Sequence, residues 1–228
     1  MISIIIPTYN ESKNVEPLLK GIDQAMIAAG ISDYEAVVMD DDSPDGTVAV
    51  VEKMGQSKFR AVNRRGKIRG LSEAVIDGFS QAKGDILAVM DADLSHPTDA
   101  LPRLARAISQ GALVAVGSRY VPGGGVNNWP WKRRFVSRVS CLLARPVTPI
   151  KDATSGFFMF RREVIQGVRL SPLGFKIGLE VYVKGKHQGK IKEVPYVFTD
   201  RREGQSKLGS KVMGQYLRQL WDLLWRAR

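Results

Sequence analysis

The sequence predicts an α/β fold, a single Rossmann-like domain in which helices flank a mostly parallel central sheet. Short apolar runs rich in β-branched residues alternate with segments whose apolar residues recur at helical spacing. This alternation extends from residue 2 to residue 117 and is typical of consecutive βαβ units. The chain has 228 residues, 44% of them hydrophobic and 25% charged, which is the size and composition of one globular domain.

Each element of the alternation follows from a local pattern. The run 2–6 is apolar, β-branched and closed by Pro7, as in a buried strand. In order, the expected elements are a strand over 2–6, a helix over 15–27, strands over 34–39 and 59–62, a helix over 71–82, a strand over 86–90, a helix over 100–109 and a strand over 113–117. Ligands of such sheets bind beyond the carboxyl ends of the strands, so the residues that follow 34–39 and 86–90 are candidates for a site.

The regular alternation stops after Tyr120, where a glycine-rich loop over 122–125 leads into a basic and aromatic segment over 129–144. The remaining expected elements are a strand over 157–161, a helix over 177–186, a strand over 191–198 and a helix from 209 to the end. We assign 1–208 to the α/β domain. Residues 209–228 are assigned to an appended amphipathic helix that contacts a membrane surface or a partner.

A formal net charge of +11 indicates an anionic partner, for which nucleic acid, phosphorylated small molecules and acidic lipid headgroups are candidates. The sequence has no base-reading motif, which argues against nucleic acid. The single cysteine, Cys141, excludes an internal disulfide framework, and two histidines are too few for an imidazole-rich metal site. This cysteine usage favours a reducing, cytoplasmic setting. No signal-peptide pattern and no apolar run of a membrane-spanning length is visible, so any work at a membrane is expected on its surface.

The clearest candidate site consists of Asp91 and Asp93, which follow the apolar run 86–90. Alternate residues of an extended segment point to the same side, so the two carboxylates would face one direction at a strand end. Hard oxygen donors of this kind suit Mg²⁺ or Mn²⁺, which complete their coordination with water and substrate phosphates. The alternative interpretation of an Asp-x-Asp pair is a solvated acidic turn.

A second acidic turn, 40–47, follows the strand expected over 34–39. Its three adjacent carboxylates, Asp40, Asp41 and Asp42, repel one another, so a functional partner explains them better than stability does. Asp41 is placed to accept hydrogen bonds from a base or a ribose. For residues 45–47, turn and helix-capping chemistry is the preferred interpretation.

Six motifs occur in order along the chain, and two of them contain the acidic turns. They are Ile6-Pro7-Thr8-Tyr9-Asn10-Glu11, the string Asp-Asp-Asp-Ser-Pro-Asp-Gly-Thr at 40–47, Met90-Asp91-Ala92-Asp93-Leu94-Ser95-His96-Pro97, Gly117-Ser118-Arg119-Tyr120, Thr154-Ser155-Gly156-Phe157 and Gly204-Gln205-Ser206-Lys207-Leu208. Together they resemble the dolichyl-phosphate mannose synthases, family 2 glycosyltransferases of GT-A fold, from residue 2 to residue 208. The string at 40–47 is that of the mannose branch, since related glucose and aminoarabinose transferases more often carry Asp-Asp-Gly-Ser there.

The resemblance implies that Asp91 and Asp93 hold Mg²⁺ or Mn²⁺ against the diphosphate of a nucleotide sugar. Ser95 belongs to the implied metal set. In relatives that have Gln at its position, the Gln side chain joins the metal shell, so the shorter Ser95 side chain implies a bridging water or weaker metal binding. Nucleotide-sugar binding is implied for Pro7, Tyr9, Glu11, Met39, Asp41, Asp91, Ala92, Asp93, Arg119, Arg201 and Lys207. The three basic residues of this set are expected to contact phosphates.

The implied reaction is the transfer of mannose from GDP-mannose to dolichyl phosphate or another polyprenyl phosphate. A phosphate monoester has a second pKa of about 6, so its oxygen is an anionic nucleophile near neutral pH and needs no general base. A single displacement inverts the anomeric centre and gives a β-linked product. The expected catalytic residues are Asp91, Asp93, Arg119 and Arg133, and the acceptor phosphate is expected on Arg119, Arg133 and Ser137 because a guanidinium forms paired hydrogen bonds with phosphate.

Several alternatives stay open. Arg133 can equally belong to a solvated basic face, and Asp152, a base in the wider superfamily, is expected to have a structural or orienting role because a phosphate acceptor needs no base. One rival function is a polyprenyl-phosphate glucosyltransferase that uses UDP-glucose. Another is a polysaccharide-building transferase, whose hydroxyl acceptor would need a base. A rival of another class is a non-catalytic module that binds anionic ligands or a membrane surface.

Two segments suit a membrane surface, because in each of them an apolar face is flanked by cations or polar residues, as in interfacial helices. We therefore expect a peripheral or monotopic protein on the cytoplasmic side of a membrane, to which a membrane-anchoring subunit could be added. The alternative is that these faces dock against the core of the domain. The apolar residues are Trp129, Trp131, Phe135, Val139 and Leu142 in the first segment and Met213, Tyr216, Leu217, Leu220, Trp221 and Leu224 in the second.

Overall fold

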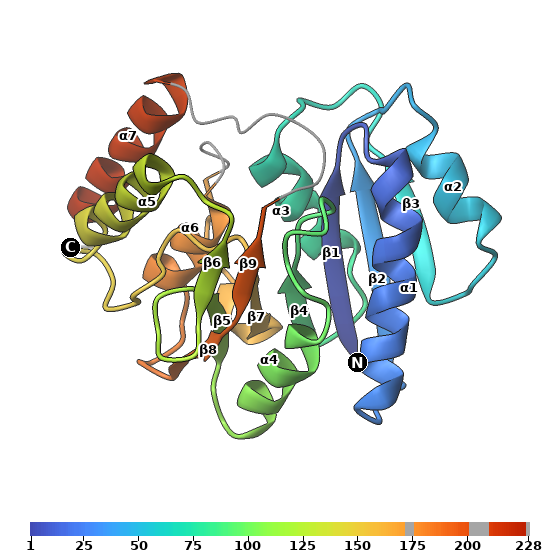
Figure 1. Ribbon diagram of the computed structural model, residues 1–228, viewed down its shortest axis with the longest axis horizontal. Coiled ribbons are helices and arrows are strands. Elements are labelled where there is room, and N and C mark those ends of the chain that lie inside the picture. The colour runs from blue at the N-terminus through green and yellow to red at the C-terminus, as the bar shows by residue number, and fades with distance from the viewer. Residues whose placement is uncertain (172–175, 201–209, 227–228) are drawn as a thin grey trace.

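A seven-stranded sheet forms the centre of the computed structural model, which describes residues 1–171, 176–200 and 210–226 (Figure 1). Its strands are β1 (Ile2–Thr8), β2 (Tyr34–Asp40), β3 (Phe59–Asn63), β4 (Ile86–Val89), β5 (Val114–Ser118), β7 (Phe158–Arg161) and β8 (Ile191–Pro195). They lie in the order β3-β2-β1-β4-β7-β5-β8. Strand β7 is antiparallel to both of its neighbours, and every other neighbouring pair is parallel. The prediction of a mostly parallel sheet is confirmed.

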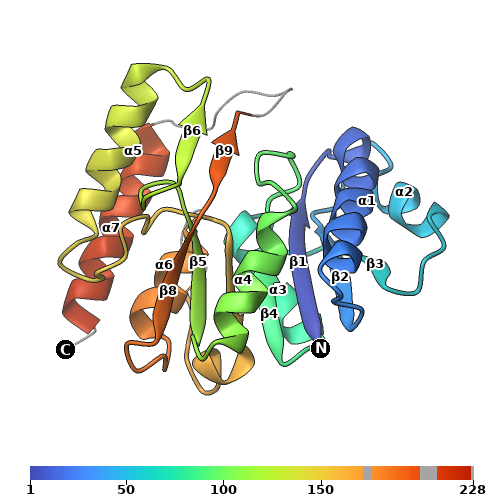
Figure 2. The ribbon, with the colours of Figure 1, turned by 60° about the horizontal axis from the view of Figure 1, so that its bottom comes forward.

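Helices cover both faces of this sheet (Figures 1 and 2). They are α1 (Ser12–Ala28), α2 (Thr47–Lys53), α3 (Leu71–Gln81), α4 (Ala100–Ser109), α5 (Trp131–Leu143), α6 (Ile177–Lys184) and α7 (Ser210–Arg226), with a 3₁₀ turn, η1 (Arg162–Ile165). Ile4 and Ile6 of β1 pack in the core that contains α1, α2 and α4, whereas Ile5 packs in the core that contains α3 and α6. The continuous apolar run of β1 follows from this arrangement, because both faces of the strand are buried.

The apolar segment over 191–198 forms two strands rather than the single strand expected from the sequence. The first is β8, which pairs with β5, and the second is β9 (Val197–Thr199), which pairs with β6 (Gly125–Asn127) in a separate two-stranded sheet. Tyr196 connects them, since its N–H donates to Ser118 at 3.1 Å and its carbonyl accepts from Gly125 at 3.0 Å. The chain therefore changes sheets at Tyr196 without a break in its apolar pattern.

The acidic turn after β2 leads into α2, a short helix that the periodicity of the sequence does not predict. Asp45 Oδ1 accepts hydrogen bonds from the Thr47 N–H at 3.0 Å and from the Thr47 hydroxyl at 2.6 Å. Asp45 Oδ2 accepts the N–H of Ser12, at the start of α1, at 2.9 Å. The interpretation of residues 45–47 as turn and helix-start chemistry is confirmed, and one carboxylate joins the beginnings of two helices.

Arg162, at the start of η1, closes the C-terminal end of α3. Its guanidinium donates to the carbonyl oxygens of Phe79 at 3.0 Å, Ala82 at 2.7 Å and Gly84 at 2.9 and 2.7 Å. The last carbonyls of a helix have no intrahelical partner, and a cation beside them also meets the negative end of the helix dipole. Because Arg162 directly follows β7, this side chain connects α3 to the antiparallel strand.

We expect Arg162→Met to lower the free energy of unfolding by about 2 kcal/mol, because hydrogen bonds from a charged group are lost and carbonyls are left without partners. Urea denaturation followed by circular dichroism measures the change. Arg169→Met is the matched control, since Arg169 is exposed, and it should stay within about 0.5 kcal/mol of wild type. Equal stability of the two variants would show that Arg162 does not have this role.

Candidate active site

A cavity of about 970 Å³ opens where β1, β2 and β4 end. Its lining includes residues that directly follow each of these strands, and this edge of a parallel sheet is where ligands are expected. The fold therefore brings together segments that are far apart in the sequence. The predicted site residues that line the cavity are Pro7, Tyr9, Glu11, Asp41, Asp91, Ala92, Asp93, Arg119, Arg133 and Ser137.

Of the predicted site residues that the structure describes, two are not part of this lining. Met39 is 1% exposed and packs in the core beside α3, because its side chain points to the helix-covered face of β2. Ser95 is 1% exposed and lies behind Asp93. Arg201 and Lys207 fall outside the described residues.

Two neighbouring side chains hold the turn that carries Asp91 and Asp93. The Ser95 hydroxyl donates to Asp93 Oδ1 at 2.5 Å, and the Ser95 N–H donates to the same oxygen at 3.1 Å. The His96 ring accepts the N–H of Asp91 on Nδ1 at 3.2 Å, and its Nε2 lies 3.9 Å from Asp91 Oδ2. Ser95 therefore supports a candidate metal ligand from behind and does not line the cavity beside it.

His96 is a buried, neutral ring that the sequence patterns do not assign to the site. Burial lowers the pKa of His96 to about 4, although the nearby Asp93 carboxylate acts in the opposite direction. The ring stacks on Phe157 with 4.9 Å between centroids. A neutral imidazole that accepts on Nδ1 carries its proton on Nε2, which here faces Asp91. His96 thus orients Asp91 without adding a charge to the cavity.

The carboxylates of Asp91 and Asp93 fit a divalent cation that arrives with a phosphate ligand. Within the described residues, no group of three or more His, Cys, Asp and Glu side chains is arranged to hold a metal. Mg²⁺ and Mn²⁺ do not need one, since they are commonly bound by one or two carboxylates together with water and substrate phosphates. The donor set is therefore that of an ion shared between protein and substrate.

The second acidic turn is stabilised by partners inside the fold. Asp40 is fully buried and accepts the Ser43 N–H at 2.7 Å and the Ser43 hydroxyl at 2.6 Å. Asp41 forms an ion pair with the buried Arg64 and accepts the N–H of Gly70 at 2.9 Å. These contacts offset the repulsion between adjacent carboxylates that the sequence suggests, and Asp41 keeps its place in the cavity lining.

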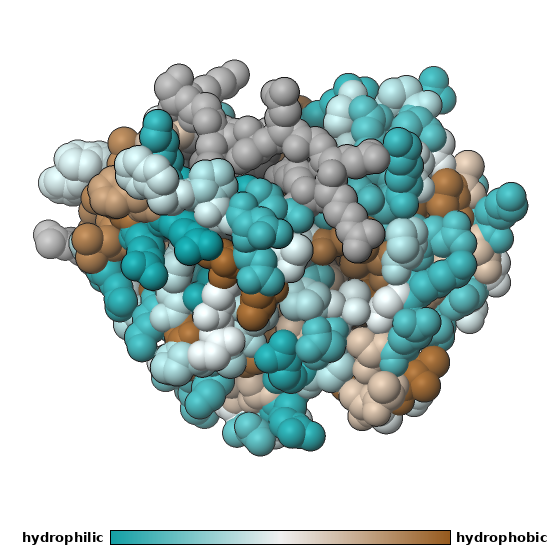
Figure 3. All heavy atoms as spheres, viewed as in Figure 1, coloured by the Kyte–Doolittle hydropathy of each residue, from teal (hydrophilic) through white to brown (hydrophobic). Residues whose placement is uncertain are grey.

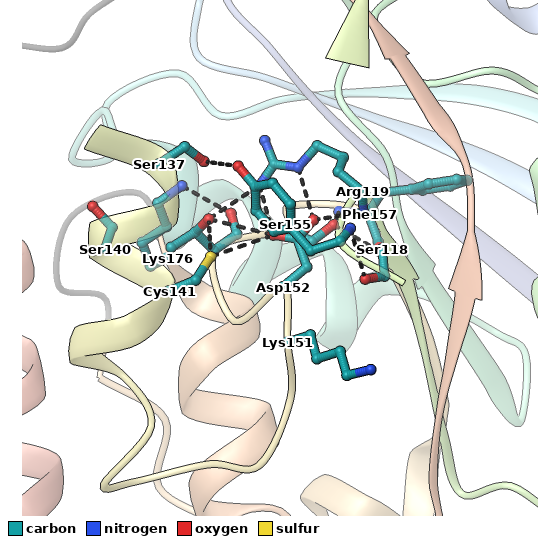
Figure 4. A network of polar contacts seen from close by, with 12 residues as sticks. Ser118, Arg119, Ser137, Ser140, Cys141, Lys151, Asp152, Ser155, Phe157 and Lys176 are labelled. Carbon is teal, nitrogen blue, oxygen red and sulfur yellow. Dashed lines mark hydrogen bonds and ion pairs between the residues drawn. The ribbon is translucent and has the colours of Figure 1, made fainter. Parts of the chain in front are cut away.

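Arg119 and Asp152 form a buried ion pair at the end of β5 (Figure 4). Arg119 donates to the Asp152 carboxylate from Nε at 2.7 Å, from Nη2 at 2.6 Å and from its backbone N–H at 2.8 Å. Burial acts to raise the pKa of Asp152, but the charge of Arg119 outweighs it and holds that pKa below its usual value. Asp152 is therefore a carboxylate that orients Arg119, in agreement with the role expected for it.

Arg133 and Ser137 approach the cavity from one side of α5. Arg133 Nη1 lies 2.7 Å from each carboxylate oxygen of Asp200. The Ser137 hydroxyl accepts a hydrogen bond from the Tyr120 hydroxyl at 2.7 Å. Together with Arg119, these side chains give the cavity a basic and hydroxyl-bearing wall.

Three residues that line the cavity, Trp129, Arg69 and Lys176, are not predicted as site residues from the sequence. Trp129 is predicted on a membrane-facing segment, but it is only 7% exposed and lines the cavity. The centroid of its ring lies 4.2 Å from the guanidinium carbon of Arg133. Arg69 donates to the Tyr9 hydroxyl at 3.1 Å at the exposed edge of the cavity. Lys176, at the start of α6, also lines the cavity. Only tertiary packing brings these residues together. The one feature of the sequence that could have indicated a site is Trp129, an aromatic residue beside a basic run.

Helices α5 and α7 lie side by side (Figures 1 and 2). The Tyr216 hydroxyl of α7 donates to the carbonyl of Ser140 on α5 at 2.6 Å. The apolar stripe predicted for α7 is divided, because Tyr216 and Leu220 are buried whereas Leu217 and Trp221 are 48% and 61% exposed. Gln219 of the same helix is also buried.

The outer side of these two helices forms an exposed apolar surface, part of which is visible at the left edge of Figure 3. No described helix has the length and apolar character needed to cross a membrane. The apolar residues of this surface, which we call the α5–α7 face, are Trp131, Phe135, Val139, Leu142, Leu217, Trp221, Leu224 and Trp225.

Known proteins share this sequence and this architecture. A dolichol-phosphate mannosyltransferase of Pyrococcus furiosus is 47% identical over 227 residues, which are 98% of this chain and 63% of that protein. A dolichol-phosphate mannosyltransferase of Saccharomyces cerevisiae is 37% identical over 97% of this chain and 86% of its own length. A polyprenol monophosphomannose synthase of Mycolicibacterium smegmatis is 36% identical over 92% of this chain and 82% of its own length. This chain thus spans less than two thirds of the Pyrococcus relative.

Among solved structures, glucosyl-3-phosphoglycerate synthase from Mycobacterium tuberculosis in complex with Mn²⁺, uridine diphosphate and glucosyl-3-phosphoglycerate has a TM-score of 0.71. It is 21% identical and covers 100% of this chain and 79% of its own, a likeness that shows the fold and agrees with the GT-A architecture implied by the motifs. The resemblance to the dolichyl-phosphate mannose synthases is confirmed by the three relatives. The model of glycosyl transferase family 2 matches residues 3–169, and the chain belongs to that family.

Proposed function

We propose that this chain transfers mannose from GDP-mannose to the phosphate of dolichol or another polyprenol, with inversion to a β-linked product. The observation that carries the proposal is that one cavity joins the turn of Asp91 and Asp93 to the basic wall of Arg119 and Arg133. The turn of Asp91 and Asp93, with a divalent cation, would bind the donor diphosphate, and the basic wall would bind the acceptor phosphate. The names of the relatives, dolichol-phosphate mannosyltransferase and polyprenol monophosphomannose synthase, support the sugar and the acceptor class.

In this proposal the donor binds at the ends of β1, β2 and β4. Tyr9, Glu11 and Asp41 line the part of the cavity assigned to the nucleoside. Asp91 and Asp93 would hold Mg²⁺ or Mn²⁺, an ion that neutralises the charge developing on the departing nucleoside diphosphate. The hydrogen bonds from Ser95 and His96 keep the two carboxylates in place for that ion.

The acceptor needs positioning rather than activation. Its phosphate is already anionic near neutral pH, so the chemical step requires an in-line approach and neutralisation of two negative reactants. His96 and Asp152, the residues near the cavity in which a general base would be sought, are both engaged: His96 accepts the Asp91 N–H, and Asp152 is paired with Arg119. These contacts support a mechanism in which the protein supplies no base.

The α5–α7 face supports a position on the cytoplasmic surface of a membrane. The inner sides of the same helices line the cavity through Val136 and Ser140 of α5 and through Met213 and Tyr216 of α7. A lipid phosphate could therefore enter the cavity while its prenyl chain stays in the bilayer. Exposed cations on α5, such as Lys132, suit the acidic headgroups of such a surface.

Incubation with radiolabelled GDP-mannose, a short polyprenyl phosphate and Mn²⁺ should move label into an organic extract, and a strong chelator should abolish the transfer. Asp91→Asn and Asp93→Asn should each reduce transfer at least about a hundredfold, because charge stabilisation by the ion is worth several kcal/mol. Asp99→Asn is the control, since Asp99 is exposed and outside the cavity lining. Undiminished transfer in chelator, or faster transfer from UDP-glucose, would refute the proposal.

Replacing Arg133 with Met should raise the KM for polyprenyl phosphate about tenfold or more, because a charge-assisted hydrogen bond to phosphate is lost. Steady-state kinetics at saturating GDP-mannose measures the KM for polyprenyl phosphate. Arg134→Met removes the neighbouring exposed arginine, which is not part of the cavity lining, and should leave this KM near the wild-type value. Equal effects of the two substitutions would assign Arg133 to a general basic surface instead.

The double variant Phe135→Ser and Trp221→Ser should bind vesicles that contain acidic lipids at least about tenfold more weakly, because each lost side chain removes burial worth about 2 kcal/mol. Cosedimentation with vesicles measures the binding. Ile27→Ser removes a comparably exposed apolar side chain from α1, and it should have no effect. If the Ile27 variant loses as much binding as the double variant, the α5–α7 face is not the contact surface.

A further inference from the structure

The cations of the cavity differ in whether a carboxylate already balances their charge. Arg119 is paired with the buried Asp152, and Arg133 is paired with Asp200. Arg69 and Lys132 are exposed, so water screens their charges. Lys176 is the remaining lining cation among the described residues, and it belongs to neither class.

Lys176 is partly buried and has no carboxylate partner within ion-pair distance among the described residues. Its Nζ donates one hydrogen bond, to the carbonyl of Thr154 at 2.9 Å. Arg119 Nη2 donates to the hydroxyl of the same threonine at 3.0 Å, so two cations converge on one residue (Figure 4). An ammonium has three donors, which leaves Lys176 with two for a ligand in the cavity.

The positive charge of Lys176 has no paired carboxylate among the described residues, and a bound anion would balance it. The buried carboxylate of Asp152 is already engaged, because Arg119 donates to both of its oxygens. Burial is the main cause that lowers the pKa of Lys176, and the charge of Arg119 adds to it, whereas Asp152 and Asp91 act in the opposite direction. A partly buried cation without a paired anion is costly to keep, so its presence points to a ligand that supplies the charge.

We propose that Lys176 binds the phosphate of the acceptor lipid directly, an inference that rests on the proposed function. The donor is the less suitable anion, because its diphosphate meets a divalent ion at Asp91 and Asp93. The acceptor phosphate brings no such ion, so protein cations must neutralise it. Since Arg119 and Arg133 each share their charge with a carboxylate, Lys176 supplies the positive charge that is not yet compensated.

The test compares Lys176→Met with wild type by calorimetric titration of three ligands: farnesyl phosphate, the phosphate-free alcohol farnesol, and GDP with Mn²⁺. The variant should bind farnesyl phosphate about tenfold to a hundredfold more weakly, as expected for loss of a charge-assisted hydrogen bond. Its affinity for farnesol, and for GDP with Mn²⁺, should stay within roughly twofold. Lys186→Met is the matched control, because Lys186 also donates to a backbone carbonyl, that of Gln166 at 2.8 Å, but is exposed and outside the cavity lining.

Thermal unfolding separates ligand binding from a structural role. The Tm of Lys176→Met should lie within about 2 °C of wild type or above it, because Met keeps the aliphatic stem and removes a poorly compensated charge. A variant that fails to fold, that loses GDP affinity equally, or that binds farnesyl phosphate like wild type would overturn the proposal. If wild type binds farnesyl phosphate but transfers no mannose, the proposed function fails, whereas the difference between wild type and Lys176→Met still decides the role of Lys176.

Discussion

The buried pair of Arg119 and Asp152 holds the two ends of the cavity in a fixed relation. Arg119 follows β5, and Asp152 lies in the loop that precedes β7, so three hydrogen bonds fasten that loop to the end of the neighbouring strand. The same loop places Gly156 against Asp91, where an added Cβ would lie 3.5 Å from the carboxylate. A buried ion pair adds little net stability but is costly to break, so its main effect here is positional. The geometry between the turn of Asp91 and Asp93 and the basic wall of Arg119 and Arg133 depends on it.

The antiparallel strand β7 makes this arrangement possible. In a fully parallel sheet, only the loops that follow strands reach the carboxyl edge. Because β7 runs in the opposite direction, its first residues pair with the last residues of β4, as in the register of Phe158 with Val89. The loop that precedes β7 therefore arrives at the same edge as Asp91. This reversal brings Thr154 into the cavity lining and Asp152 beside Arg119, whereas a parallel strand would have left both at the far edge.

Local pattern is enough to predict the strands up to β5, all helices among them except α2, and the position of Asp91 and Asp93 at a strand end, because periodicity and strand ends are properties of neighbouring residues. It was not enough for Met39, since a strand buried on both faces gives no cue to which side faces the ligand. The change of sheet at Tyr196 is hidden for a similar reason, because the apolar run continues through it. Lys176 lies 57 residues from Arg119 in the sequence, and only the packing of α6 brings both to Thr154.

In the proposed function, helices α5 and α7 allow one chain to act on a soluble donor and a lipid acceptor. Extraction of a prenyl chain from the bilayer would cost about 0.8 kcal/mol for each carbon unit exposed to water, so an efficient site must come to the membrane surface instead. Helix α5 meets this constraint because its two faces differ. Trp131 and Phe135 are exposed on one face, and Val136 and Ser140 line the cavity on the other. In the proposed function, a lipid phosphate that enters past α5 would leave the headgroup region and meet the cavity cations Arg119 and Lys176. The loss of its hydration is then offset by charges that the fold already holds in place, which is why an uncompensated lysine is more useful there than a stabilising ion pair.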